Sequence, residues 1–229
     1  MIWDIVKNAA ADVWDEMLYL MVFNIIWVVS TIPGLWLIVQ GTALAFLPFI
    51  LLGAILLLPC AFVLFGLIFT VYDIGEAKGI GLGTFWKHLR QTWRQAYVWG
   101  LINLVVGVIV WVNWFFYAQV EAEWSGFAQI VVLAISLLWL ILQLLALAFY
   151  PRLERPGFKL ALRNAGVVLG RYPLAGFFML ILVLMISGVA FFFPIIYFLG
   201  AFSIMAVIAN RVVAAILIKE KRREEEREA

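Results

Sequence analysis

The sequence predicts an all-α membrane protein with six transmembrane helices, an N-terminal interfacial helix and two cytoplasmic amphipathic helices. Of the 229 residues, 66% are hydrophobic and 13% are charged, whereas soluble domains are about 45–50% apolar and about 25% charged. Windows such as 44–72 and 173–209 contain no charged residue and exceed the roughly 18 apolar residues typical of a membrane helix. The Lys and Arg residues also gather in segments that six spans place on one side of the bilayer.

The first sixteen residues predict an interfacial helix that leads into the membrane. Trp3, Val6 and Val13 recur at helical spacing, while Asp4 and Asp12 occupy the opposite face. The segment lacks the basic start of a secretory signal peptide, so we expect the first span to remain in the mature protein.

Six apolar segments within one transmembrane domain, residues 1–229, account for most of the chain. The predicted spans are residues 17–39, 44–72, 95–119, 127–149, 173–193 and 197–218. We expect Pro33, with Gly34, to bend or end the first helix because proline removes a backbone hydrogen bond. Pro194 and Gly200 favour a reversal at the far surface between the last two spans. Residues 219–229 predict a charged cytoplasmic helical tail.

Two segments between spans predict amphipathic helices that lie flat on the cytoplasmic surface of the membrane. The first comprises residues 84–95, with Phe85, Trp86, Leu89 and Trp93 on one face and Lys87, His88, Arg90, Gln91 and Arg94 on the other. The second comprises residues 158–169, where Lys159 and Arg163 oppose an apolar face. In both, a Phe precedes an Arg by five positions, which suggests an internal repeat. Membrane anchoring alone explains this composition, and the alternative is a basic platform for anionic lipid or a partner.

The positions of the basic residues predict which side of the membrane each segment faces. All 16 Lys and Arg lie in, or at the membrane borders of, the N-terminal segment, the second-to-third and fourth-to-fifth connections, and the C-terminal segment. Six spans put these four segments on one side. The positive-inside rule makes that side the cytoplasm, so we expect both termini to be cytoplasmic.

Two stretches of the first half resemble the YesL-like family of bacterial integral membrane proteins. Residues 24–34 contain Asn24, Trp27 and Pro33, similar to the family's first-span signature. Residues 84–96, with Phe85 followed by basic and aromatic residues, look like its cytoplasmic segment before the third span. The resemblance implies an accessory membrane protein in the neighbourhood of carbohydrate uptake systems rather than a permease.

The polar residues argue against enzymatic, metal and cofactor chemistry. All 14 acids lie outside the predicted spans or at their ends, so no carboxylate is available at the midplane for proton coupling. The single histidine, His88, is expected on a solvated face and cannot form a bis-histidine or HExxH site. The single cysteine, Cys60, is expected to be a small core residue. A net charge of +2 is too small to argue for nucleic acid.

The favoured function is a non-enzymatic accessory or scaffold subunit of a larger membrane complex, with a basic cytoplasmic face that binds a partner or anionic lipid head groups. The candidate contact residues are Lys87, Arg90, Arg94, Lys159, Arg163, Asn210 and Arg211. Arg211 lies within the last span, so it either extends to the head groups or faces the bundle and binds a lipid or partner. The alternative is a small carrier or lipid-handling protein. A third hypothesis, a lipid enzyme, requires Asp73, Glu76 or His88 to converge on a cleft.

Overall fold

The computed structural model describes residues 2–228, and every regular element among them is helical. Six of these helices are long and apolar enough to cross a membrane, as the hydropathy of the sequence predicts. Met1 and Ala229, at the ends of the predicted domain and tail, lie outside the described residues. The elements are α1 (Ile2–Asp15), α2 (Met17–Ala43), α3 (Leu47–Gly75), α4 (Leu82–Gln119), α5 (Ser125–Phe149), the 3₁₀ turn η1 (Tyr150–Arg152), α6 (Phe158–Arg171), α7 (Pro173–Phe192), α8 (Ile195–Leu199) and α9 (Ala201–Glu228).

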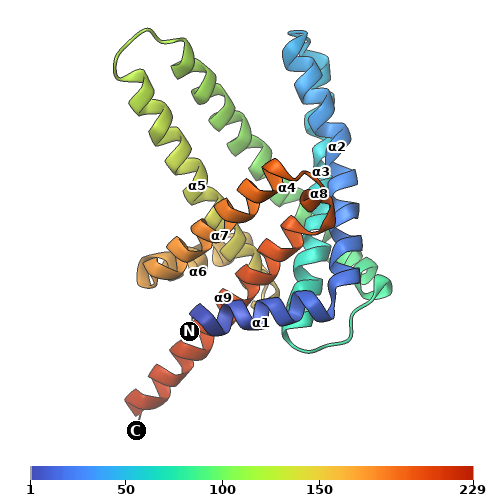
Figure 1. Ribbon diagram of the computed structural model, residues 1–229, viewed down its shortest axis with the longest axis vertical. Coiled ribbons are helices and arrows are strands. Elements are labelled where there is room, and N and C mark those ends of the chain that lie inside the picture. Colours follow the sequence, from blue (N-terminus) through green and yellow to red (C-terminus); the bar gives the residue numbers. More distant parts are fainter. Residues whose placement is uncertain (1, 229) are drawn as a thin grey trace.

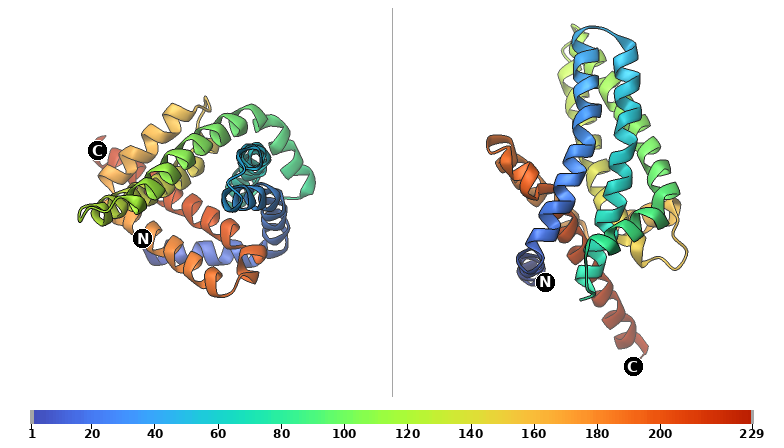
Figure 2. Two further views of the ribbon diagram at one scale, coloured as in Figure 1. Left: turned by 90° about the horizontal axis from the view of Figure 1, so that it is seen from above. Right: turned by 90° about the vertical axis from the view of Figure 1, so that its right-hand side faces the viewer.

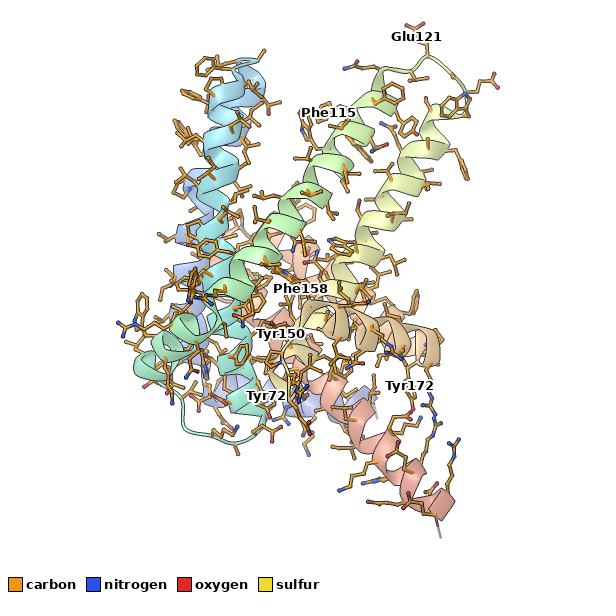
Figure 3. All side chains as sticks on the ribbon, turned by 180° about the vertical axis from the view of Figure 1, so that it is seen from behind. Tyr72, Phe115, Glu121, Tyr150, Phe158 and Tyr172 are labelled. Carbon is orange, nitrogen blue, oxygen red and sulfur yellow. The ribbon has the colours of Figure 1, made fainter. Side chains whose placement is uncertain are left out.

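The molecule has two ends of different character (Figure 1). One end holds α1, the α3–α4 connection and the end of α9, and we call it the charged end. The other holds the α2–α3 turn at residues 44–46 and the α4–α5 loop at residues 120–124, and we call it the far end. Figure 3 shows Glu121 at the tip of the far end, and Tyr72 and Tyr172 near the charged end.

Helices α2 and α3 form a hairpin whose backbones approach closely. A Cβ atom added to Gly53 would lie 2.7 Å from the carbonyl oxygen of Gly34, so only glycine fits this crossing. The expectation that Pro33 ends or bends the first helix is wrong as to its end, since α2 continues through Pro33 to Ala43. Proline interrupts only one backbone hydrogen bond, and the close contact with α3 holds the helix together around it.

The predicted boundary between the first amphipathic helix and the third span is also wrong. Residues 82–119 form one continuous helix, α4. Phe85, Leu89 and Ala96 are buried in succession, so the face that packs on the bundle runs across the predicted boundary without a break. The ribbon of α4 turns along its length (Figure 2), which gives its first part a different direction from the rest.

The last two predicted spans differ from the structure in how they are joined. After α7, the five-residue helix α8 makes the reversal, and α9 begins at Ala201 and not at residue 197. Helix α9 then runs without interruption to Glu228, so the predicted charged tail is the end of this helix.

The buried core lies nearer the charged end than the far end. Its largest fully buried side chains come from the six long helices and η1, and they include Phe23, Phe65, Phe85, Trp99, Leu145, Tyr150, Met179 and Val207. No residue between positions 101 and 140 is buried. The outer parts of α4 and α5 therefore form an arm whose apolar side chains remain exposed in the single chain (Figure 3).

Candidate functional site

Arg211 is paired within the protein. Its Nε and Nη2 atoms donate to the two carboxylate oxygens of Asp12, each at 2.5 Å. This two-point ion pair joins α9 to α1, whose Ile5 and Ala9 are buried at the same interface. Sequence reasoning placed Arg211 below the membrane surface but did not find its partner, 199 positions away.

His88 also differs from its prediction, because it is not on a solvated face. Its Nε2 atom lies 2.7 Å from Oδ2 of Asp73, and the two side chains are only 14% and 12% exposed. The His88 ring packs against Phe69, and Lys78 lies 3.5 Å from the other carboxylate oxygen. Phe85 and Thr92 are buried and lie three and four positions from His88, on the same face of the helix. This helical spacing is the sequence signal that could have placed His88 toward the bundle.

A third group of charges ties the end of α9 to the corner between α6 and α7. Arg171 Nη1 lies 2.7 Å from Glu220 Oε2, and the Tyr172 hydroxyl donates to the other oxygen of Glu220. Arg223 donates to the Tyr172 oxygen at 2.9 Å. Figure 3 shows Tyr172 beside this part of α9. The first turn of the predicted tail is thus anchored, and sequence reasoning missed this.

The predicted contact residues of the first amphipathic segment lie together on the outside of α4. Lys87 and Arg90 line an open groove of about 550 Å³ with Gly83, Trp86 and Gln91. Arg94 lies one turn further, 5.2 Å from the centre of the Trp93 ring. Trp86 and Trp93 are exposed beside the cations, although the sequence placed them on the opposite face. We call Lys87, Arg90 and Arg94 the α4 patch.

Lys159 and Arg163 form a second exposed pair on α6, which we call the α6 patch. The inner face of α6 is buried through Ala161, Ala165 and Val168. Seen from above (Figure 2), α6 and the start of α4 lie on different sides of the molecule. The structure therefore divides the predicted contact residues into two patches and does not bring them into one cluster.

Asn210 is part of the α3–α9 interface and not of either patch. Its Nδ2 atom donates to the carbonyl oxygen of Val71 at 3.1 Å, and the residue is 3% exposed. Its Oδ1 atom is buried without a hydrogen-bond partner among the described residues. This matches the interhelical role that amides usually have in membrane bundles.

A groove of about 500 Å³ separates α1 from the lower part of α9. Asp4, Ile5 and Asn8 line one wall, and Arg211, Ala214, Ala215, Ile218, Lys219 and Arg222 line the other. Lys219 lies 5.4 Å from the centre of the Tyr172 ring. The lining thus combines cations and an amide with small and aliphatic side chains.

Two further findings concern the ionisable side chains that metal or catalytic sites use. Among residues 2–228, no three His, Cys, Asp or Glu side chains come close enough to hold a metal ion. Asp73 and His88 do converge, as the third hypothesis required, but neither residue lines either of the two grooves described above. The contact between them joins α3 to α4.

Comparison of the chain with family models, with curated proteins and with solved structures finds no match.

Proposed function

We propose that this protein is a non-enzymatic accessory or scaffold subunit of the bacterial inner membrane, whose basic patches contact anionic lipid head groups or the acidic surface of a partner. In this proposal the charged end is cytoplasmic and carries both termini. Helix α1, the start of α4 and α6 are then the surface helices at the membrane interface.

The observation that carries the proposal is how the cations are distributed between paired and unpaired positions. Arg211, Arg171 and Lys78 have carboxylate partners in the protein. None of the five cations of the α4 and α6 patches has an ion-pair partner among the described residues. Exposed cations beside aromatic residues are typical of the head-group layer, where each contributes about 1 kcal/mol of attraction to an anionic leaflet.

A second candidate function is a small carrier or lipid-handling protein. The groove between α1 and α9 favours it, because its lining suits a molecule with a charged head and an apolar chain. The relation to the YesL-like family and to carbohydrate uptake systems stays a prediction from the sequence.

Fluorescence transfer from the α4 patch to labelled lipids tests the proposal. Cys60 is the single cysteine, so Cys60→Ala with Gly83→Cys provides one labelling site, and nothing lies within 4 Å of a side chain added at Gly83. In vesicles we expect more transfer to labelled phosphatidylglycerol than to labelled phosphatidylcholine. Lys87→Gln with Arg90→Gln should remove the difference. The matched control, Lys221→Gln with Arg227→Gln on the tail, should preserve it.

Purification in mild detergent separates the two candidate functions. A partner in fixed stoichiometry that is lost in the Lys87→Gln, Arg90→Gln variant supports the scaffold. A bound amphiphile without a partner supports the carrier. Equal transfer to both lipids together with no partner would contradict the proposed role of the patches.

A further inference from the structure

We propose that the groove between α1 and α9 binds the phosphate of an anionic phospholipid, with the acyl chain lying on its apolar lining. This inference rests on the proposed contact with anionic head groups and assigns it a second, separate site. It concerns a concave site between two helices, whereas the α4 and α6 patches are open surfaces.

The three cations that line the groove differ in whether their charge is already paired. Arg211 is fixed by Asp12, so it gives the groove a rigid wall and little net charge. Among the described residues neither Arg222 nor Lys219 has an ion-pair partner, and the Lys219 Nζ atom lies 5.4 Å from the centre of the Tyr172 ring. These two cations therefore remain free to bind a phosphate oxygen.

The other lining residues favour a lipid over a soluble phosphate. Ile5 and Ile218 supply aliphatic surface, and Ala214 and Ala215 leave room between the helices because their side chains are small. Asn8 lies on the opposite wall, where its amide suits the hydroxyl groups of a glycerol head group. A phosphate without an apolar chain would leave the aliphatic wall exposed to water.

Native mass spectrometry of the full chain in detergent tests this site, with phosphatidylglycerol and chainless glycerol phosphate as the two probes. We expect one tightly bound phosphatidylglycerol. Arg222→Gln should weaken its binding roughly tenfold, because a charge-assisted hydrogen bond is lost, and Lys219→Gln should weaken it further. Lys221→Gln is the matched control, since Lys221 pairs with Glu225 and does not line the groove.

Ala215→Trp provides a variant that fills the groove without changing its charge, and it should also displace the lipid. Unchanged lipid binding in both Arg222→Gln and Ala215→Trp would overturn the site. Equal binding of glycerol phosphate and phosphatidylglycerol would overturn the assignment to a lipid. Neither result depends on the fluorescence signal at Gly83, so the groove and the α4 patch are tested independently of each other.

A second inference rests on a different observation, the place where the chain reverses between α7 and α9. Asn24 of α2 donates from Nδ2 to the carbonyl oxygens of Tyr197 and Phe198, and its Oδ1 accepts the Ser203 N–H at 3.2 Å. The Ser203 hydroxyl donates to the carbonyl oxygen of Leu20 at 3.0 Å. The Tyr197 and Phe198 carbonyl groups and the Ser203 N–H lie at the break between α8 and α9, where helix ends leave backbone groups without helical partners.

The position of Asn24 on α2 gives the depth of this reversal. Asn24 lies seven residues beyond Met17 and nineteen before Ala43, which is about 10 Å from one end of α2 and about 28 Å from the other. Figure 1 shows the reversal partway up the molecule, well below the turns of the far end. Beyond this level, α2 and α3 expose large apolar side chains such as Trp36 and Ile55, which suit contact with lipid.

We infer that α7, α8 and α9 form a re-entrant hairpin, which enters the bilayer from the charged end and turns back inside it. Irregular backbone at membrane depth is tolerated only where protein groups satisfy its hydrogen bonds, and Asn24 supplies them. Phe191, Phe192 and Phe193 near the turn are 61–77% exposed. Three exposed phenylalanines suit contact with acyl chains and not with water.

Accessibility of a nitroxide label at the turn tests this hairpin in vesicles. In the Cys60→Ala background, a label at Phe192→Cys should collide readily with oxygen and rarely with a water-soluble nickel complex. Labels at Glu121→Cys and Arg155→Cys, in the far loop and at the charged end, should show the opposite preference. If Phe192→Cys misfolds, Phe191→Cys provides a second position. Nickel accessibility at the turn equal to that at Glu121→Cys would overturn the inference.

Discussion

Arg211 and Lys87 show two uses of a cationic side chain within one protein. Arg211 is the one charged residue of the first part of α9, residues 201–218. Asp12 neutralises it through two hydrogen bonds. Lys87 is exposed on the outside of α4 and has no ion-pair partner among the described residues. The first arrangement stabilises the fold, because a charge at this depth is costly without a partner. The second leaves a charge for an external ligand.

The Asp12–Arg211 pair should behave as a coupled unit in unfolding experiments. We expect Asp12→Ala and Arg211→Ala each to lower the free energy of unfolding by about 1–3 kcal/mol, below the about 3–5 kcal/mol of fully buried pairs because both side chains keep some exposure. The double variant should lose clearly less than the sum of the two. Denaturation in detergent measures all three. Additive losses would contradict a direct interaction.

Asn24 should contribute more to stability than an amide that bonds only its own helix. Asn24→Ala leaves two backbone carbonyl groups and the Ser203 N–H without partners, and we expect a loss of about 1–3 kcal/mol. Asn113→Ala is the control, because Asn113 donates to Ile109 of the same helix and is more exposed; it should change stability by less than about 0.5 kcal/mol. Thermal unfolding in one detergent compares them. Equal effects would contradict the bridging role.

Residue pairs were harder to predict than residue classes. Asn24, Asn210 and Arg211 each fall inside a long apolar segment, so the sequence was enough to place them within predicted spans. The partners of Arg211 and His88 come from other helices, so they depend on tertiary contacts that periodicity does not encode. An arginine in an apolar helix requires a counter-charge, but several acids at the membrane borders satisfied that condition equally.

At the scale of elements, hydropathy predicted the six long helices and periodicity did not predict their joints. The continuity of α4 was missed because a change from charged to apolar composition looks like a boundary, although the backbone continues. The passage of α2 through Pro33 was missed because its close packing on α3 depends on Gly34 and Gly53. Composition indicates whether a helical segment faces water or an apolar environment. Packing against other helices determines where the helix ends.

Gly53 and Gly107 make a matched pair for testing the α2–α3 crossing. Gly53→Ala brings a Cβ atom within 2.7 Å of the Gly34 carbonyl oxygen, and we expect a loss of about 1–3 kcal/mol from overpacking. Gly107→Ala meets nothing within 4 Å, so it should be neutral or gain up to about 1 kcal/mol from helix propensity. Unfolding in the same detergent gives the sign of each effect. A neutral Gly53→Ala would contradict the close crossing.

At the scale of the whole molecule, charge and burial vary along the same direction. Ion pairs and the buried core concentrate toward the charged end, while the outer parts of α2–α3 and α4–α5 expose apolar side chains around the two far turns. This asymmetry suits a protein anchored in lipid that presents its cations on one side. The sequence predicted that asymmetry because the positions of Lys and Arg are visible without coordinates. It did not predict which cations form ion pairs and which remain exposed in the two patches.

Labelling of single cysteines in intact cells tests the central claim most directly, namely that the charged end faces the cytoplasm and the far end faces outward. In the Cys60→Ala background, a membrane-impermeant maleimide should label Glu121→Cys in the far loop after the outer membrane, if present, is permeabilised. Lys87→Cys and Arg155→Cys should be labelled only after the inner membrane is disrupted. Labelling of Lys87→Cys and Arg155→Cys in intact cells, with Glu121→Cys protected, would contradict the orientation and with it the proposed role of the basic patches.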